Sequence, residues 1–105
     1  MAATDSNGVQ FVRMTVASAG TLSSVASSAT SVLLLAANPN RLGVVVVNES
    51  TATLYIKYGA TASLTSYTYS IAPGATWEMP TRAYSGQIDA IWSAANGNAR
   101  VTELT

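Results

Sequence analysis

Hydrophobic and polar residues alternate with a period of two along much of the chain, which is the pattern of β-strands with one buried face. The alternation is clearest in residues 51–59 (TATLYIKYG), 66–72 (SYTYSIA) and 75–80 (ATWEMP). Residues 30–37 (TSVLLLAA) form an apolar run, and the β-branched run at 44–50 (VVVVNES) is typical of a strand covered on both faces. No segment keeps the 3.6-residue apolar period of an amphipathic helix. The pattern therefore predicts strands along most of the chain.

Turn signals separate these predicted strands. They fall at residues 38–43 (NPNRLG), at Pro73-Gly74 and at Asn96-Gly97. About seven or eight short strands at intervals of roughly 8–12 residues predict an all-β fold, either an antiparallel β-sandwich or a jelly-roll-like barrel. A parallel β-helix is the structural alternative, but it requires a fixed repeat, and the chain shows none.

The first part of the chain has a weaker pattern. Residues 9–17 (VQFVRMTVA) alternate and predict a strand or an extended arm. Residues 18–31 (SAGTLSSVASSATS) are rich in serine and alanine, which fits a flexible linker, but the leucine and valine within this segment fit a short edge strand equally well. We therefore expect an N-terminal arm at residues 1–19 and a single domain at residues 20–105.

The C-terminal residues 87–105 contain the strongest hairpin signal of the chain. Two strand-like segments flank Asn96-Gly97, a pair of residues that favours a two-residue turn. In that register Trp92 lies opposite Val101 on the same face. Neither face of the predicted hairpin is purely apolar, so we expect partial cover on both sides, as at a subunit contact.

Charged residues are scarce. They make up 10% of the 105 residues and the formal net charge is zero, whereas about 25% is typical of soluble proteins. Nucleic-acid-binding proteins carry a basic excess that neutralises phosphates, so we expect no nucleic-acid partner. A weakly charged surface instead favours a protein that packs against copies of itself or against a larger partner. No segment approaches the roughly 18 apolar residues of a membrane span, and residues 1–10 lack the pattern of a secretory signal, so no membrane partner is expected.

Candidate catalytic groups are few. The chain has no histidine and no cysteine, which excludes a Ser-His-Asp triad, a cysteine nucleophile and a cysteine-ligated metal. The acidic residues are isolated, and in the predicted hairpin Asp89 and Glu103 point to opposite faces, which disfavours a carboxylate pair. Lys57 alternates outward in its strand, so we interpret it as a solubilising edge-strand residue rather than as the partner of a catalytic serine. We expect no enzyme, no cofactor and no metal site, although calcium on scattered oxygen ligands stays an open alternative.

Aromatic side chains are candidates for recognition. Tyr67, Tyr69 and Trp77 share their predicted strand faces with apolar residues, which places them in the core. Tyr55 and Tyr84 are the best candidates for an exposed surface that binds carbohydrate.

The arginines lie in or beside predicted loops and in the arm. Arginine is enriched at interfaces because its guanidinium makes bidentate, weakly hydrated contacts. We therefore expect ion pairs between subunits in which Arg13, Arg41, Arg82 and Arg100 meet Glu49, Glu78, Asp89 and Glu103. Four isolated surface arginines are an equally open alternative.

Three segments of the chain resemble small virion proteins of tailed bacteriophages. They are RLGVVVVNESTATLYIKYGATAS (41–63), APGATWEMP (72–80) and YSGQIDAIWSAANGNARVTEL (84–104). Such proteins share the order of a strand entering an Asn-Glu/Asp-Ser turn, a Leu-Tyr-Ile/Val-Lys-x-Gly strand, an aromatic-Glu-x-Pro segment and a closing Gly-x-Ile-Asp-x-Ile-Trp hairpin. The resemblance covers about residues 20–105. It brings no catalytic motif, and many proteins of this kind have no assigned role.

The resemblance implies a β-sandwich on the outer surface of the capsid: a head decoration (cement) protein that binds the major capsid protein and copies of itself, with a homotrimer as the expected oligomer. The alternative is a tail or head-fibre domain that binds host surface glycans. In such proteins an N-terminal arm often attaches the domain to its neighbour, here by strand addition. The expected interface residues are Val9, Phe11, Arg13, Met14, Arg41, Arg82, Asp89 and Arg100.

Overall fold

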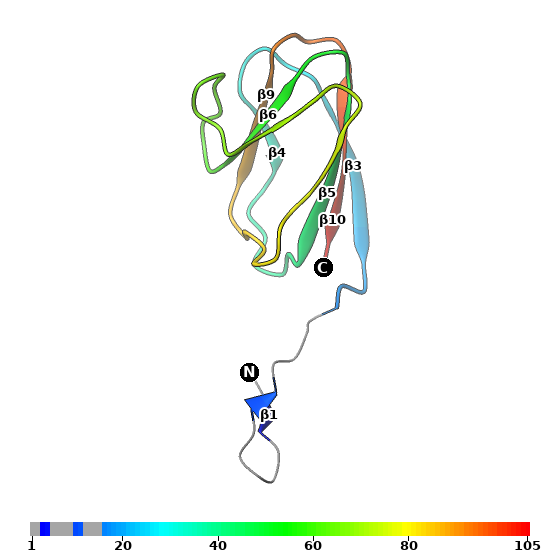
Figure 1. Ribbon diagram of the computed structural model, residues 1–105, viewed down its shortest axis with the longest axis vertical. Helices are drawn as coiled ribbons and strands as arrows, with labels where there is room; N and C mark the ends of the chain where they lie inside the picture. Colours follow the sequence, from blue (N-terminus) through cyan, green and yellow to red (C-terminus); the bar gives the residue numbers. More distant parts are fainter. Residues whose placement is uncertain (1–2, 5–9, 12–15) are drawn as a thin grey trace.

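The computed structural model of the protein describes residues 3–4, 10–11 and 16–105. From Gly20 onward the chain folds as two four-stranded antiparallel sheets packed as a sandwich (Figure 1). The all-β fold that the hydrophobic pattern predicts is therefore confirmed. Over the described residues no helix is long and apolar enough to cross a membrane.

Each sheet has a defined spatial order of strands. Sheet 1 contains β3 (Gly20–Ala26), β10 (Asn98–Leu104), β5 (Gly43–Glu49) and β8 (Thr76–Glu78). Sheet 2 contains β4 (Val32–Leu35), β9 (Ile88–Trp92), β6 (Leu54–Tyr58) and β7 (Tyr69–Ile71). Two further short strands, β1 (Ala3–Thr4) and β2 (Gln10–Phe11), pair with each other.

The chain passes between the two sheets at almost every connection. From β3 to β10, only β6 and β7 are both consecutive in the chain and neighbours in one sheet. The first and last strands of the sandwich, β3 and β10, lie side by side in sheet 1 (Figure 1). This order, in which consecutive strands wrap from one sheet to the other, is that of a double-sheet jelly roll.

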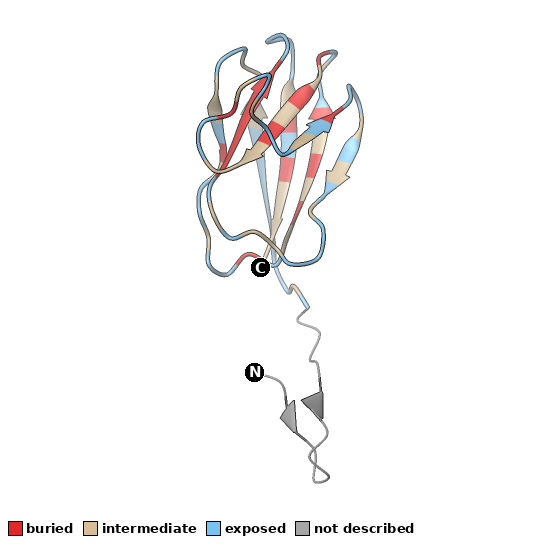
Figure 2. Cartoon of the chain, turned by 60° about the vertical axis from the view of Figure 1, so that its left-hand side comes forward, coloured by how far each residue is buried: buried red, intermediate tan, exposed pale blue. Residues whose placement is uncertain are grey.

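The core fills the space between the sheets with alternate residues of the strands. Val44 and Val46 of β5 are buried, and Trp92 of β9 is 1% exposed. Figure 2 shows such buried positions on strands of both sheets, whereas most loop positions are exposed. Val45 and Val47 point the other way and are only half-buried. The prediction that residues 44–50 are covered on both faces is therefore wrong, because nothing among the described residues encloses the outer face of sheet 1.

The strand that is covered on both faces is β9, in which all five residues are buried. The loop formed by residues 59–68 provides the outer cover. Ala62 of this loop is 3% exposed, and its N–H donates to Ser31 Oγ at 3.0 Å. The same Ser31 oxygen lies 3.4 Å from Asp89 Oδ2, so the loop is tied to the outer side of β9.

The predicted C-terminal hairpin is wrong. β9 and β10 belong to different sheets, and residues 93–97 cross from one sheet to the other. Val101 pairs with Val46, and Trp92 pairs with Leu54, rather than with each other. An Asn-Gly pair favours a tight bend, but it does not determine which strand pairs with the segment that follows the bend.

Gly97 is needed for close packing rather than for a left-handed turn. The glycines with positive φ in the described part of the chain are Gly59 and Gly74. A Cβ atom added at Gly97 would collide with the carbonyl oxygen of Glu49 and would lie 2.7 Å from Ser50 Cα. The crossover therefore passes directly against the end of β5, where only glycine fits.

The Ser/Ala-rich segment at residues 18–31 contains an edge strand. β3 pairs with β10 along its whole length, from Gly20 opposite Leu104 to Ala26 opposite Asn98. Of the two interpretations of this segment, the edge strand is confirmed.

Candidate interaction surface

Arg41 is a buried structural residue. It is 3% exposed, and its Nε lies 2.8 Å from Glu103 Oε2. Its Nη1 donates to the carbonyl oxygens of Tyr84 and Gly86, at 2.7 and 2.8 Å. Its Nη2 donates to the carbonyl oxygen of Ala36 at 2.7 Å. The guanidinium thus joins three segments of the chain, and its ion pair, which we expected between subunits, lies within one subunit.

Asp89 also lies inside the chain. It is 6% exposed, and its Oδ1 accepts a hydrogen bond of 2.8 Å from Gln87 Nε2. Ser31 Oγ supplies the longer contact to Oδ2. Buried carboxylates require such donors, because an unpaired charge away from water is costly. In the isolated subunit Asp89 is therefore covered rather than presented to a partner.

Lys57 lies on an internal strand, since β6 is flanked by β9 and β7 in sheet 2. Its interpretation as an edge-strand residue is wrong, because alternation defines the face of a strand but not its place in the sheet. The Nζ atom donates to Ser66 Oγ at 2.8 Å and to the carbonyl oxygen of Thr61 at 3.2 Å. These contacts hold the loop of residues 59–68 over sheet 2.

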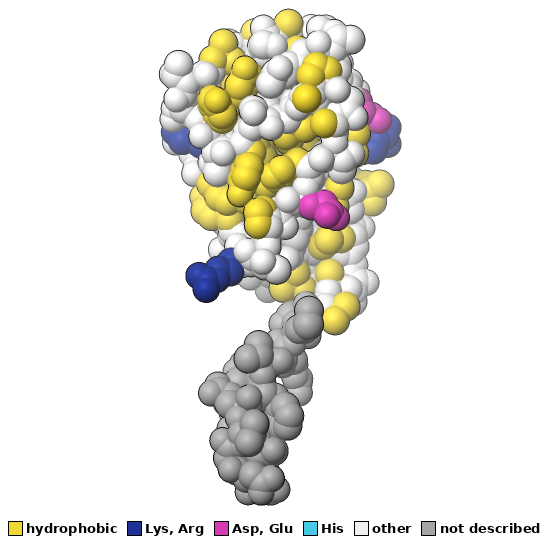
Figure 3. Space-filling view, viewed as in Figure 1, with side chains coloured by type: hydrophobic (Ala, Val, Ile, Leu, Met, Phe, Trp, Pro, Cys, Tyr) yellow, Lys and Arg dark blue, Asp and Glu magenta, His cyan; other side chains and the backbone are white. Residues whose placement is uncertain are grey.

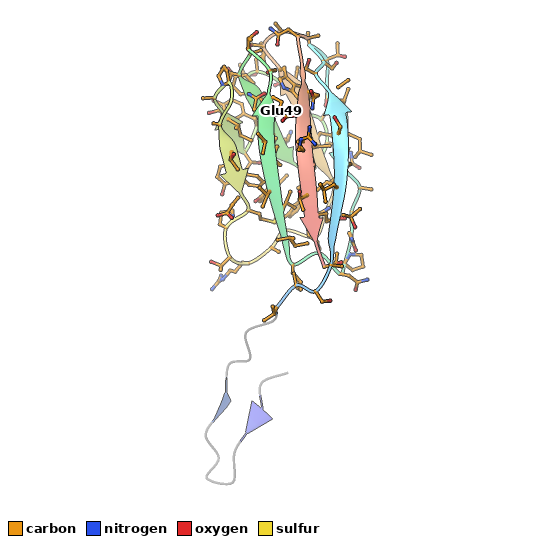
Figure 4. All side chains as sticks on the ribbon, turned by 90° about the vertical axis from the view of Figure 1, so that its right-hand side faces the viewer. Glu49 is labelled. Atoms are coloured by element: carbon orange, nitrogen blue, oxygen red, sulfur yellow. The ribbon has the colours of Figure 1, made fainter. Side chains whose placement is uncertain are left out.

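Arg100 forms the second ion pair recorded among the described residues, with Nε 3.3 Å from Glu49 Oε1. The two side chains keep 57% and 39% of their surface exposed. Hydrogen bonds from Arg100 and then from Asn98 hold the pKa of Glu49 below its usual range. Figure 4 places Glu49 on the outer side of sheet 1. On this side of sheet 1 the charged residues are therefore this pair and the exposed Glu78 of β8, which lies opposite Val45.

The remaining predicted interface residues lie away from this pair. Arg82 is exposed, in the loop between β8 and β9, with a φ of 71°. The backbone of Phe11 pairs with Ala3, which joins β2 to β1. Three of the predicted residues lie outside the described part of the chain: Val9, Arg13 and Met14.

The outer side of sheet 1 is a broad surface with little charge, which we call the open face. Its apolar and neutral members are Leu22, Val45, Val47, Thr102 and Leu104. Thr102 lies between Leu22 on β3 and Val45 on β5, so that these side chains form a row across the sheet. Leu22 is 66% exposed, and the other four are half-buried. The row ends at the exposed Glu78 of β8.

A group of aromatic side chains packs between the two sheets at the edge formed by β7 and β8. Tyr58 and Tyr84 stack with 4.5 Å between ring centroids and 3° between planes. Tyr69 and Trp77 meet at 5.1 Å and pack against the core. Burial, together with the neighbouring Tyr69, raises the pKa of Tyr58 to about 12. Tyr84, which we expected to be exposed, is therefore half-buried with one ring face covered.

A second aromatic pair lies on the outer side of sheet 2. The ring centroids of Tyr55 and Tyr67 are 4.7 Å apart. Tyr67 is 43% exposed, so its predicted place in the core is wrong. The reason is that β7 begins only at Tyr69, which leaves Tyr67 in the loop before the strand.

The charged groups do not combine into a reactive centre. Asp89 and Glu103 lie in different sheets, each with its own partners. No group of three or more acidic side chains suited to a metal ion occurs within the described residues.

Asn48 is the polar residue that the sequence reasoning missed. It is 0% exposed, and its Nδ2 donates to the carbonyl oxygens of Ala52 and Ile71, at 2.8 and 2.9 Å. Its Oδ1 lies 2.7 Å from Ser50 Oγ and 3.4 Å from Trp92 Nε1. The available signal was its position, because Asn48 continues the inward-facing series of the two buried valines in β5.

No family model, curated protein or solved structure matches this chain.

Proposed function

We propose that this protein is a non-enzymatic structural subunit of a tailed-bacteriophage virion. Its role is that of a head decoration (cement) protein that binds the major capsid protein on the outer surface of the capsid. The observation that carries the proposal is the open face of sheet 1, a strand surface with an exposed leucine, several half-buried neutral residues, one ion pair and a single further charge, Glu78, at its β8 edge. Surfaces that bury area against a partner are depleted in charge at their centre.

The distribution of charge supports the same role. Arg41 and Glu103 neutralise each other inside the chain, and Arg100 and Glu49 pair on the surface. Figure 3 looks onto the side of the sandwich where the two sheets meet. Hydrophobic side chains gather across the middle of this view, charged side chains are few, and an acidic and a basic side chain lie together at its right edge. A surface of this kind repels neither a copy of itself nor a large neutral partner.

The jelly-roll order of the strands is compatible with this role. Jelly rolls occur in viral capsid proteins and in lectins, and one architecture hosts many functions. The fold therefore supports the virion role only in combination with the open face and with the segments of the sequence that resemble virion proteins.

The mechanism of a cement protein follows from binding linkage. A subunit that binds the assembled shell, and not its dissociated parts, stabilises the shell by RT ln(1 + [L]/Kd), about 2.7 kcal/mol per site at a hundredfold excess over Kd. The apolar members of the open face would supply the buried area. Arg100 and Glu49 would fix the orientation of the subunit.

The test compares phage heads that lack this protein with the same heads after addition of purified protein. We expect the wild-type protein to bind and to raise the temperature at which the heads release DNA. Thr102→Glu, which places a charge at the centre of the open face, should abolish both effects. Ser70→Glu adds the same charge to an exposed position of β7 and is the matched control. Heads that resist heat equally well with and without the protein would contradict the cement role.

A second candidate function rests on the aromatic pair formed by the exposed Tyr67 and the half-buried Tyr55, which we expected to be exposed. Rings of this kind can stack against sugar faces, which fits the alternative of a tail or head-fibre domain that binds host glycans. A glycan array probed with the wild-type protein and with Tyr67→Ala distinguishes the two candidates. Glycan binding that Tyr67→Ala removes would favour this second function, and an array without binding would eliminate it.

A further inference from the structure

Four strands form the outer edges of the two sheets, and three of them carry features that block further strand pairing. β7 and β8 have only three residues each, and Glu78 adds a charge to β8. β4 has four residues, and its register with β9 shifts between Leu33 and Leu35. β3 has none of these features. It has seven residues, no charge, no proline and a regular register with β10.

β3 is also rigid and accessible. Its N-terminal end is fixed by the N–H of Ser18, which donates to the carbonyl oxygen of Thr105 at 2.9 Å. Its C-terminal end is fixed by the N–H of Ser27, which donates to the carbonyl oxygen of Gly97 at 2.9 Å. Six of its seven residues are exposed, the exception being the half-buried Val25. Figure 4 shows no strand on its free side. An ordered, unpaired edge of this kind is a template for strand addition.

We propose that β3 pairs with β3 of a second copy of this chain, in antiparallel orientation about a two-fold axis. The pairing joins the two copies of sheet 1, each of four strands, into one continuous sheet. A two-fold interface uses the same surface on both subunits, and two-fold dimers are the commonest symmetric oligomers. The inference goes beyond the virion role and does not depend on it, and it replaces the homotrimer that the resemblance implies.

The sequence of β3 is compatible with pairing to itself. A register centred on Ser23 places Leu22 opposite Ser24 of the other copy, and Thr21 opposite its Val25, with each pair on one face. None of these pairs brings like charges together, and the formal net charge of the chain is zero. Two copies therefore meet without electrostatic repulsion. On the open face, the pairing brings Leu22, the exposed leucine of β3, against the second copy.

The oligomeric state of the full chain in solution is the first test. Sedimentation velocity over a range of protein concentrations should show an equilibrium between the 10.8 kDa monomer and a dimer of twice that mass. A protein that stays monomeric at every concentration, or that forms a trimer, would overturn the proposal. A monomer that pairs β3 with an extended segment of another protein would equally contradict self-pairing.

Charge substitutions test the register itself. In the double variant Leu22→Lys with Ser24→Lys, the lysines of the two copies lie directly opposite each other, so we expect the dimer Kd to rise by about tenfold or more. Mixing this variant with Leu22→Glu plus Ser24→Glu should restore a dimer that contains one copy of each. The control, Ser70→Lys with Thr76→Lys, adds the same charge at the opposite edge of the sandwich and should leave the Kd unchanged. A mixture that stays monomeric, or a control as weak as the β3 variant, would rule out this interface.

Hydrogen exchange on the wild-type protein needs no substitution, so it is informative even if a variant folds poorly. Backbone amides of residues 20–26 should gain protection as the protein concentration rises, while amides of β7 should not. Protection of β3 that is independent of concentration would refute the pairing.

Discussion

Two buried polar side chains, Arg41 and Asn48, hold the loops at opposite ends of β5. Each donates hydrogen bonds to backbone carbonyl oxygens of neighbouring segments. Within the described residues, no buried side-chain nitrogen or oxygen lacks a hydrogen-bond partner. Removing either side chain therefore takes donors away from buried carbonyl groups, and a buried polar group that loses its partner costs more than the lost bond itself.

Asn48→Ala should lower the free energy of unfolding by about 2–3 kcal/mol, because the carbonyl of Ile71 loses the amide that donates to it and the carbonyl of Ala52 keeps only the Ser50 hydroxyl. Asn96→Ala removes an exposed amide that contacts Thr51, and should cost less than about 1 kcal/mol. Urea unfolding measures both values. Equal losses for the two variants would show that Asn48 has no special role.

Arg41→Lys should destabilise the protein by about 3 kcal/mol, because an ammonium group cannot reproduce the fork of bonds to Glu103 and three carbonyls. Arg100→Lys, at the exposed ion pair, should change the stability by no more than about 0.5 kcal/mol. Thermal unfolding of the two variants provides the comparison. A tolerated Arg41→Lys would mean that the charge alone is sufficient at this site.

The raised pKa of Tyr58 predicts a loss of stability in alkali. Because the folded state favours the neutral phenol, the contribution of this group is complete below pH 10 and is lost as the pH rises through about 12. Absorbance titration of the folded protein should show one phenol that ionises near pH 12, and Tyr58→Phe should remove that step. If the ionisation near pH 12 persisted in Tyr58→Phe, it could not belong to Tyr58.

Among the structural elements, the strands whose own residues alternate between hydrophobic and polar were predictable from the sequence. Alternation located β6, β7 and β8 because each strand presents one face to the core. The spatial order of strands was not predictable, since it depends on pairing between residues far apart in the chain. This is why Lys57 was placed on an edge strand and why β9 and β10 were joined as a hairpin.

The candidate site was less predictable than the fold. The sequence identified Arg41 and Asp89 as important polar residues, but it assigned them to an interface because burial depends on loops that fold over them. For Arg41 these are two loops, one that contains Tyr84 and Gly86 and one that contains Ala36. The sequence did not predict the open face as a surface, because the valine run at residues 44–50 was assigned to a strand covered on both faces.

The crossover between β9 and β10 passes close to the end of β5, and this contact leads to a further prediction. Gly97→Ala should destabilise the fold by roughly 1–3 kcal/mol, because the added methyl group collides with the backbone at Glu49 and Ser50. Gly20→Ala provides the control, since its methyl group would lie at an ordinary distance of 3.4 Å from Thr102. If Gly97→Ala were tolerated as well as Gly20→Ala, the close approach of the crossover to β5 would be refuted.

At the scale of the whole molecule, the jelly roll presents its sheets in different ways. The loop of residues 59–68 covers part of sheet 2, whereas no part of the chain that the structure describes covers the outer side of sheet 1 from β3 to β8. The proposed dimer uses the edge of sheet 1 and extends its open face across two subunits. A particle surface would then meet a larger, continuous and weakly charged sheet, which increases the area that each binding event buries.

An electron cryomicroscopy reconstruction of the phage particle that carries this protein tests the central claim most directly. We predict density for the two-sheet sandwich on the outside of the head, with the open face of sheet 1 against the major capsid protein. Density confined to the tail or to fibres, or particles that lack the protein, would contradict the account.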